Sequence, residues 1–367
     1  MSYLSLKNFQ VSEIPNYFEL KHINNVRSLY SNEEIPSQTR IVQIPLDNII
    51  SYKVAIASST LLRKIYKKLK NSRKQHIILS LYLAQYMENK DNKNNKFKSY
   101  FDILPKDLDN IPIFWGEEDL KYLKGSPFLS MIEHRNKTFT DEFEEISSHV
   151  EPGELDLLFI GYEDDKLKRY KFTRSLVSSR NFSITLDLEN LNVLVPIADM
   201  INHRTIPLTR WGFENGIFFV DTTDIIPIHT EITDSYGTKS NYLYLLYYGF
   251  TIFSPNSLIR NLDSVDIELN ELSITLTLPF SEHTLNQMLD EMGRSKTTKS
   301  KKRKLYYINK KLISLLDGYH LLQSYKKTHE LLESGTLSSN QYNALVIIYG
   351  EKKVLQTYIE NIFEIIN

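Results

Sequence analysis

The sequence contains no cysteine. Disulfide bonds are therefore excluded, and so are zinc sites built on thiolate ligands. No stretch of the chain reaches the ~18 consecutive apolar residues that a membrane-spanning helix needs. Residues 1–10 lack the apolar core of a signal peptide. We therefore expect a cytoplasmic or nuclear protein that has no membrane segment and holds no metal.

Neither sign of charge is in excess, because 44 Lys and Arg residues face 45 Asp and Glu residues. A formal net charge of −1 gives no general reason to expect a polyanionic partner, so we expect no direct nucleic-acid binding. The chain has 367 residues, of which 41% are hydrophobic and 24% are charged. These values are typical of a globular protein with two or three domains and a sizeable core.

Polar residues interrupt or follow an apolar run near the middle of the chain. The run from Val195 to Ile201 carries one carboxylate, Asp199, and is followed directly by Asn202 and His203. Buried polar groups need hydrogen-bond partners. The pattern therefore indicates either a functional site or a satisfied polar network inside the core. His203 is not a zinc ligand in this interpretation, because neither a cysteine nor a second histidine at i+4 accompanies it.

Aromatic residues gather shortly after this run. Tyr236 stands between Ser235 and Gly237, and a series of tyrosines then leads to Gly249 and Phe250. The tyrosines of the series are Tyr242, Tyr244, Tyr247 and Tyr248. Taken alone, such a series is typical of core packing.

Three motifs in a fixed order carry a family resemblance. They run from Pro196 to His203 (Pro-x-x-Asp-x-x-Asn-His), from Tyr236 to Asn241 (Tyr-Gly-x-x-Ser-Asn), and from Tyr248 to Phe250 (Tyr-Gly-Phe). This segment resembles the C-terminal half of a SET domain of the Rubisco large-subunit methyltransferase class. Each motif alone is a weak signal, whereas the three together at these intervals are a strong one.

Two further segments support the resemblance. Tyr100 to Pro105 (Tyr-x-x-x-Leu-Pro), Trp115 and Leu123 to Gly125 are similar to the helical segment that the class inserts into its SET domain. Ser179 to Phe182 matches a Ser-Arg-x-Phe motif whose arginine lies near the cofactor in the family. The planar guanidinium of Arg180 suits a carboxylate. A structural role for Arg180 is an equal alternative.

The resemblance implies an α+β SET fold with several short β-sheets, an inserted helical segment and a C-terminal helical domain. It places the N-terminal half of the SET domain in residues 1–60 and the insert in residues 61–175. The C-terminal half, with the active site, would occupy residues 176–255. Residues 256–367 would form a mostly helical domain, a candidate for substrate binding.

The implied function is S-adenosylmethionine-dependent protein-lysine N-methylation of a non-histone protein, such as a ribosomal protein or a translation factor, by a monomer. The resemblance makes Tyr236 catalytic, in an orienting role, since a tyrosine with a pKa of about 10 is a poor base at neutral pH. It assigns cofactor binding to Asn25, Arg27, Arg180, Asp199, Asn202, His203 and Tyr236. It assigns substrate binding to Tyr248, Phe250 and Arg180. Tyr248 favours lysine over histidine as the target.

One departure from the family pattern lies at Val26-Arg27-Ser28, where the class has a Gly-x-Gly loop beside the cofactor. Glycine lets a backbone approach closely and tolerates positive φ. Either the loop takes another path and still binds the cofactor through its backbone, or cofactor affinity is lost. Restoring both glycines is expected to tighten cofactor binding.

Two other functions stay open. The chain is alternatively a catalytically degenerate SET protein that serves as a binding module, or an RNA- or ribosome-binding protein that uses its basic segments, residues 63–74 and 296–304. We interpret the first basic segment as a solvated helix face. The second is interpreted as a disordered linker, with a nuclear localisation signal as the alternative.

Overall fold

The computed structural model describes residues 7–10, 15–23, 26–87, 95–162, 165–254, 262–270, 272–294, 300–319 and 325–367. The chain divides into two compact units. Unit 1 comprises Met1–Asp107 and Thr138–Thr238, and unit 2 comprises Leu108–Lys137 and Lys239–Asn367. Helix α6 (Phe128–Ser147) contributes residues to both. The SET and insert boundaries expected from the sequence stay predictions.

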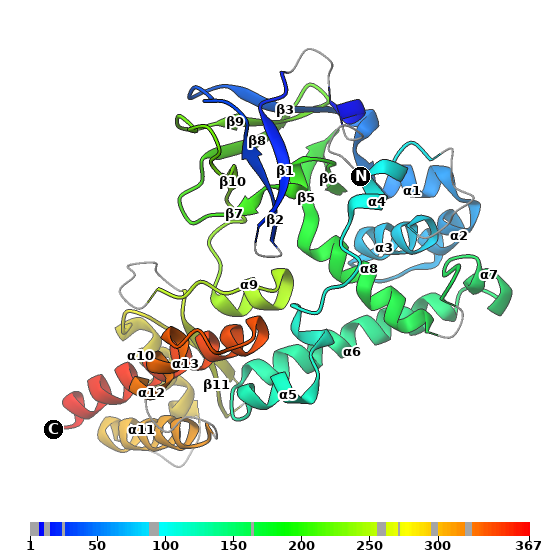
Figure 1. Ribbon diagram of the computed structural model, residues 1–367. Helices are drawn as coiled ribbons and strands as arrows, with labels where there is room; N and C mark the ends of the chain where they lie inside the picture. Colours follow the sequence, from blue (N-terminus) through cyan, green and yellow to red (C-terminus); the bar gives the residue numbers. More distant parts are fainter. Residues whose placement is uncertain are drawn as a thin grey trace. The chain divides into compact units, whose positions relative to one another are not determined.

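Among its described residues, unit 1 has four small β-sheets (Figure 1). Three of them are antiparallel, and the shortest is a parallel pair. They are the hairpin β1 (Phe18–Ile23) and β2 (Val26–Ser31); the sheet β3 (Arg40–Pro45), β9 (Ile217–Thr222) and β8 (Thr209–Glu214); the sheet β4 (Ile50–Ser51), β6 (Glu189–Leu194) and β5 (Asn181–Leu186); and the pair β7 (Asn202–His203) and β10 (Thr233–Asp234).

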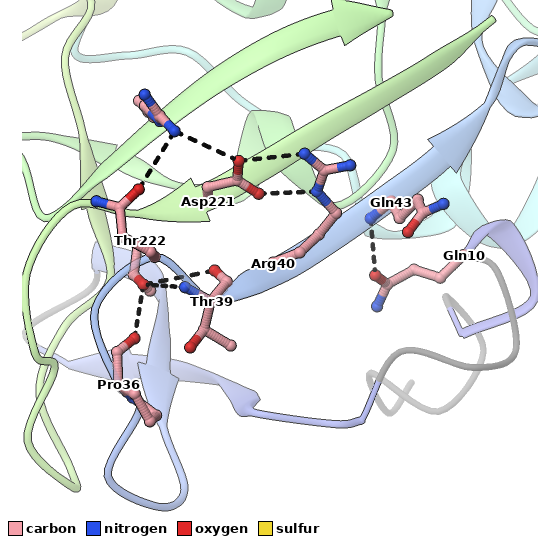
Figure 2. Close-up of polar contacts among 9 residues, drawn as sticks. Gln10, Pro36, Thr39, Arg40, Gln43, Asp221 and Thr222 are labelled. Carbon is pink, nitrogen blue, oxygen red and sulfur yellow. Dashed lines mark hydrogen bonds and ion pairs between the residues drawn. The ribbon is translucent and has the colours of Figure 1, made fainter. Parts of the chain in front are cut away.

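The edge of the β3–β9–β8 sheet is held by a polar cluster, which Figure 2 shows. Arg40 Nε donates to Asp221 Oδ1 at 2.8 Å, and the guanidinium lies over the Phe219 ring at 3.8 Å from its centroid. The Thr222 hydroxyl donates to the Pro36 carbonyl at 2.7 Å and accepts from the Thr39 backbone N–H at 2.9 Å. These contacts fix the sheet against the loop that precedes β3.

The helices of unit 1 lie mainly between β4 and β5 in the sequence. They are α1 (Tyr52–Ser58), α2 (Thr60–Lys68), α3 (Lys74–Tyr86), α4 (Lys98–Ile103), α7 (Pro152–Asp156) and α8 (Lys166–Arg180), with 3-10 turns at Lys7–Phe9, Leu46–Asn48 and Ala198–Met200. Helix α2 turns Leu62 and Ile65 inward and exposes Arg63, Lys67 and Lys68, as expected of a solvated helix face, while Lys64 is half-buried and pairs with Glu154.

Helix α8 carries Arg180 as its last residue and is anchored by a buried ion pair. Arg174 Nε donates to Glu142 Oε2 of α6 at 2.9 Å, and both side chains are almost fully buried. The Tyr170 hydroxyl donates to the same carboxylate oxygen at 2.8 Å. Burial, followed by the charge of Glu142, raises the pKa of Tyr170 well above its usual value. These hydrogen bonds offset part of the desolvation cost of the buried ion pair. The pair in turn fixes the end of α8.

Unit 2 is mostly helical around one long helix. Its apolar core includes Leu305, Ile308, Leu355 and Tyr358. The elements are the 3-10 helices Pro112–Phe114 and Lys121–Leu123, α5 (Glu117–Leu120), α9 (Asn241–Tyr248), the antiparallel hairpin β11 (Ser264–Leu269) and β12 (Leu272–Thr277), α10 (Glu282–Arg294), α11 (Lys301–Asp317), α12 (Tyr325–Glu333) and α13 (Ser339–Ile366).

The expected α+β class with several short sheets is confirmed. The linker interpretation of residues 296–304 is wrong for its last four residues, because α11 begins at Lys301 and Ser300 Oγ caps it by accepting from the Arg303 N–H. Residues 295–299 lie outside the described residues. Within the described ranges, no helix is long and apolar enough to cross a membrane.

Candidate active site

Asn202 joins two strands of unit 1 that are far apart in the sequence. Its Nδ2 donates to the Arg27 carbonyl at 3.1 Å and to Glu231 Oε1 at 3.0 Å. Arg27 lies on β2 and Asn202 on β7. The structure therefore brings two of the expected cofactor-binding residues together. Asn25, also expected there, lies outside the described residues.

Asp199 is the centre of a buried polar network. The Tyr100 hydroxyl donates to Asp199 Oδ2 at 2.7 Å. Arg180 Nη1 donates to the Asp199 carbonyl at 2.8 Å and lies 3.4 Å from Oδ2. Asp199 Oδ1 and Arg180 Nε are both buried, and neither has a hydrogen-bond partner within the described residues. Buried orphan atoms of opposite kinds are typical of a site that binds a polar ligand.

The backbone that carries Asp199 is strained at the residue that begins the turn. Ile197 has φ 73°, although β-branched residues rarely adopt positive φ. Such a conformation costs about 1–3 kcal/mol and persists where the surroundings enforce it, which is often at functional sites. The strain places the 3-10 turn Ala198–Met200 so that Asp199 meets Arg180 and Tyr100.

Positive charge exceeds negative charge in this network. Burial, followed by the neighbouring charge of Arg180, lowers the pKa of Arg27 from 12.5 to about 10, so Arg27 stays ionised at neutral pH. Burial raises the pKa of Asp199, while Arg180 acts in the opposite direction. Arg180 pairs with Asp199, whereas Arg27 donates to the Ile103 carbonyl and senses the Asp199 charge without a direct contact. This balance suits a further anionic group, such as a ligand carboxylate.

Tyr236 and His203 are held together by a backbone contact. The Tyr236 N–H donates to His203 Nδ1 at 3.0 Å, and the two rings lie 5.3 Å apart. Because Nδ1 accepts, the imidazole is in its neutral form with the proton on Nε2. The Tyr236 hydroxyl donates to the Ile201 carbonyl at 2.9 Å. Its hydrogen is therefore engaged, and the side chain offers an oxygen atom to any incoming amine.

Sequence reasoning missed three residues of this site. Asp234 pairs in register with His203 across the β7–β10 pair, and burial raises its pKa to about 6. Glu231 accepts from Asn202, and Tyr100 donates to Asp199. Tyr100 opens the Tyr-x-x-x-Leu-Pro motif and Asp234 stands two residues before Tyr236, so both had a signal in the sequence. Glu231 had none.

The positions of the missing glycines lie in regular strand structure. Val26 and Ser28 belong to β2, pair with Ile23 and Lys21, and have no positive φ. The backbone there therefore does not require glycine. Val26 is exposed and Ser28 is buried. The effect of these residues on cofactor affinity stays a prediction.

Tyr248 and Phe250, expected to bind the substrate, belong to an aromatic cluster in unit 2. Tyr244 stacks on Phe250 with ring centroids 5.2 Å apart, and Tyr248 lies 6.2 Å from Phe250. Lys239 Nζ lies 5.8 Å from the centroid of the Tyr248 ring. Burial raises the pKa of Tyr248 to about 12, so its hydroxyl is protonated at neutral pH. Burial lowers the pKa of Lys239 beside these rings, so this surface favours the neutral form of an amine.

The described residues contain no group of three or more His, Cys, Asp or Glu side chains that could hold a metal ion. No protein-family model matches the chain.

Part of the chain is similar in sequence to lysine N-methyltransferases. Over 214 aligned residues, 47% of this chain, the sequence is 28% identical to ribosomal lysine N-methyltransferase 1 of Saccharomyces cerevisiae. Over 133 residues, 36% of this chain, it is 32% identical to the Rubisco large subunit N-methyltransferase of Nicotiana tabacum. The aligned stretches span only 36% and 25% of these relatives, respectively.

The fold is that of the SET domain of LSMT, the Rubisco large-subunit methyltransferase. A crystal structure of that domain bound to lysine and AdoHcy matches with a TM-score of 0.79 at 20% identity, covering 98% of this chain and 91% of that chain. The predicted resemblance and the predicted SET fold are thereby confirmed.

Proposed function

We propose that the chain is an S-adenosylmethionine-dependent protein-lysine N-methyltransferase. The observation that carries the proposal is the buried array of Arg27, Arg180 and Asp199 beside Asn202 and Tyr236 in unit 1. The names of the relatives and the ligands in the similar solved structures support the same reaction.

The residues present fit the methionine end of the cofactor. The excess positive charge of Arg27 and Arg180 and the orphan Arg180 Nε suit its carboxylate. The orphan Asp199 Oδ1 would accept from an ammonium or hydroxyl group. Asn202 and His203, by the family pattern, would hold the remaining polar groups. When bound, the cofactor supplies a methyl group attached to a positively charged sulfur.

Tyr236 would orient the reacting amine rather than remove its proton. Its hydroxyl already donates to Ile201, so it can accept a hydrogen from a neutral amine and thereby direct the nitrogen lone pair. Holding two reactants in line can lower a barrier by about 7–11 kcal/mol. The Tyr236 ring also offers a face that favours positive charge on sulfur.

The aromatic cluster of Tyr244, Tyr248 and Phe250 would receive the substrate lysine. A free lysine has a pKa of about 10.4, and a desolvating aromatic surface shifts it toward the neutral, nucleophilic form. The proton would leave to solvent before methyl transfer. The resemblance also assigns Arg180 to substrate binding. In the structure Arg180 donates to the Asp199 carbonyl in unit 1.

The substrate class that we propose is a non-histone protein such as a ribosomal protein or translation factor. One relative is named for a ribosomal target and another for Rubisco. We further propose a monomer that acts in the cytoplasm or nucleus, with the SET halves at 1–60 and 176–255, the insert at 61–175 and a C-terminal domain at 256–367.

Substitution of the tyrosine hydroxyl tests the mechanism. Methyl transfer from labelled cofactor to a cytosolic lysate is compared for wild type, Tyr236→Phe and a control, Tyr52→Phe. Tyr52 also donates its hydroxyl, to Glu189 Oε1 at 2.7 Å in unit 1. Loss of one preorganised polar contact at the reacting centre lowers the rate about 10²–10³-fold, so we expect this loss for Tyr236→Phe alone, at equal folded fraction.

Equal labelling by Tyr236→Phe and wild type would remove the hydroxyl from the mechanism. Cofactor binding without any labelling by wild type would favour the degenerate binding module. Acid hydrolysis of the labelled protein separates methyl-lysine from methyl-histidine, and a methyl-histidine product would contradict the assignment of lysine as the target.

A further inference from the structure

Helix α11 of unit 2 carries a basic and aromatic solvent face. Four cationic side chains on it are exposed: Lys301, Lys302, Arg303 and Lys310. None of the four makes an ion pair with a carboxylate within the described part of the chain. Their charges are therefore available to a partner. Figure 1 shows the helix in orange.

Two adjacent tyrosines lie between these cations. Tyr306 is 67% exposed and Tyr307 is 51% exposed. The helix is anchored by other residues, since Leu305, Ile308 and Leu312 enter the core of unit 2. The two rings therefore contribute little to packing. An exposed pair of large rings on an already anchored helix is typical of a binding surface.

The whole chain has a net charge of −1, so the positive charge of this face is segregated from a more acidic remainder. From Lys301 to Leu316 the helix has no acidic residue. The side chains of Lys304 and Lys311 turn aside and donate to the carbonyls of Leu289 and Glu268. What remains toward solvent is a stripe in which Arg303 and Lys310 stand about 10 Å apart along the helix axis, on either side of the rings.

Single-stranded nucleic acid fits this arrangement better than other anions. Lysine and arginine neutralise phosphates, while bases stack on exposed aromatic rings whatever their sequence. An acidic protein segment would use the cations but would not require two neighbouring rings. In a duplex the bases are stacked inside the double helix and cannot stack on the two rings.

We propose that the α11 face, formed by Lys302, Arg303, Tyr306, Tyr307 and Lys310, binds single-stranded nucleic acid, for which RNA is the probe. This revises the expectation of no nucleic-acid binding. That expectation rested on the net charge of the whole chain, which does not reveal a local excess of positive charge on one face. The proposal is independent of methyl transfer.

The test is fluorescence anisotropy of a labelled, unstructured 20-nucleotide RNA with the full chain. Three or four phosphate contacts predict a slope of log K against log salt of about −2 to −3, or a loss of about 15- to 60-fold between 50 and 200 mM salt. The double variant Tyr306→Ala/Tyr307→Ala should weaken binding at least about 5-fold through lost stacking. Lys302→Glu/Lys310→Glu should weaken it further and flatten the slope.

The matched control is Lys67→Glu/Lys70→Glu, which reverses two exposed lysines in the other basic segment of the chain. It should leave RNA affinity within about 2-fold. Thermal melting checks that every variant is folded. The proposal is overturned if RNA does not bind at 50 mM salt, if the control weakens binding as much as the α11 variants, or if the tyrosine variant binds normally. Equal affinity for polyglutamate would overturn it in favour of an acidic protein partner.

Discussion

Glu351 is a fully buried carboxyl group at the centre of unit 2, and we predict that it makes stability fall as pH rises. It lies on α13 and accepts hydrogen bonds at Oε1 from the hydroxyls of Ser126, at 2.6 Å, and Tyr242. The Tyr319 hydroxyl interacts with the same carboxyl group. Lys352 lies over the Tyr319 ring, 5.5 Å from its centroid. Burial raises the pKa of Glu351 from 4.5 to about 7, against the hydrogen bonds, which lower it.

The magnitude follows from this difference in pKa. The folded chain binds the Glu351 proton more tightly than the unfolded chain, so the contribution to stability is complete below pH 4.5 and is lost as pH rises to about 7. One pKa unit corresponds to about 1.4 kcal/mol, so the loss is about 3 kcal/mol. Above pH 7 the carboxyl group is ionised in both the folded and the unfolded chain, so its contribution to stability no longer changes with pH.

The assay compares the free energy of unfolding of Glu351→Gln with wild type between pH 4 and 8. Glutamine resembles the protonated acid, so the two proteins should differ little at pH 4, and the variant should gain about 3 kcal/mol over wild type by pH 8. The control Glu364→Gln, on the exposed end of α13, should show no such trend. A difference between Glu351→Gln and wild type that is constant with pH, or that grows toward low pH, would refute the reasoning.

Two further substitutions test particular contacts. Tyr100→Phe leaves the buried Asp199 carboxylate without its 2.7 Å donor, and chemical denaturation should show a loss of about 1–3 kcal/mol; an unchanged midpoint would mean that water or Arg180 replaces the hydroxyl. Gly249→Ala should destabilise the chain by at least about 1 kcal/mol, because φ is +77° and the new Cβ would lie 2.2 Å from the Asn110 side chain and 3.1 Å from its backbone. Gly153→Ala, with open space around it, is the control and should cost much less.

Short motifs in the sequence mark parts of the fold near the site. The Ser-Arg-x-Phe motif falls at the junction of α8 and β5. The start of α11 was misjudged because the run of lysines resembled a linker. The Ser300 cap and the inward Leu305 and Ile308 extend the helix over those lysines.

The partners within the site could not be read from the sequence, since they come from distant segments. Asn202 meets Arg27 across 175 positions, and Tyr100 meets Asp199 across 99. Periodicity identifies a buried face but not which chain segment covers it. For the same reason Glu231, an acceptor for Asn202, was not found. The sequence therefore named candidate site residues, whose roles stay predictions, while their hydrogen-bond geometry required the structure.

The measurement that tests the central claim most directly is a calorimetric titration of the chain with S-adenosylmethionine. We expect saturable binding at one site, weakened about 10- to 100-fold in Arg180→Lys, because lysine keeps the charge but loses the planar fork that makes charge-assisted hydrogen bonds. Arg210→Lys, on the exposed surface of β8, should bind as wild type does. Absence of heat and of any thermal shift with the wild-type chain at high protein concentration would contradict the account.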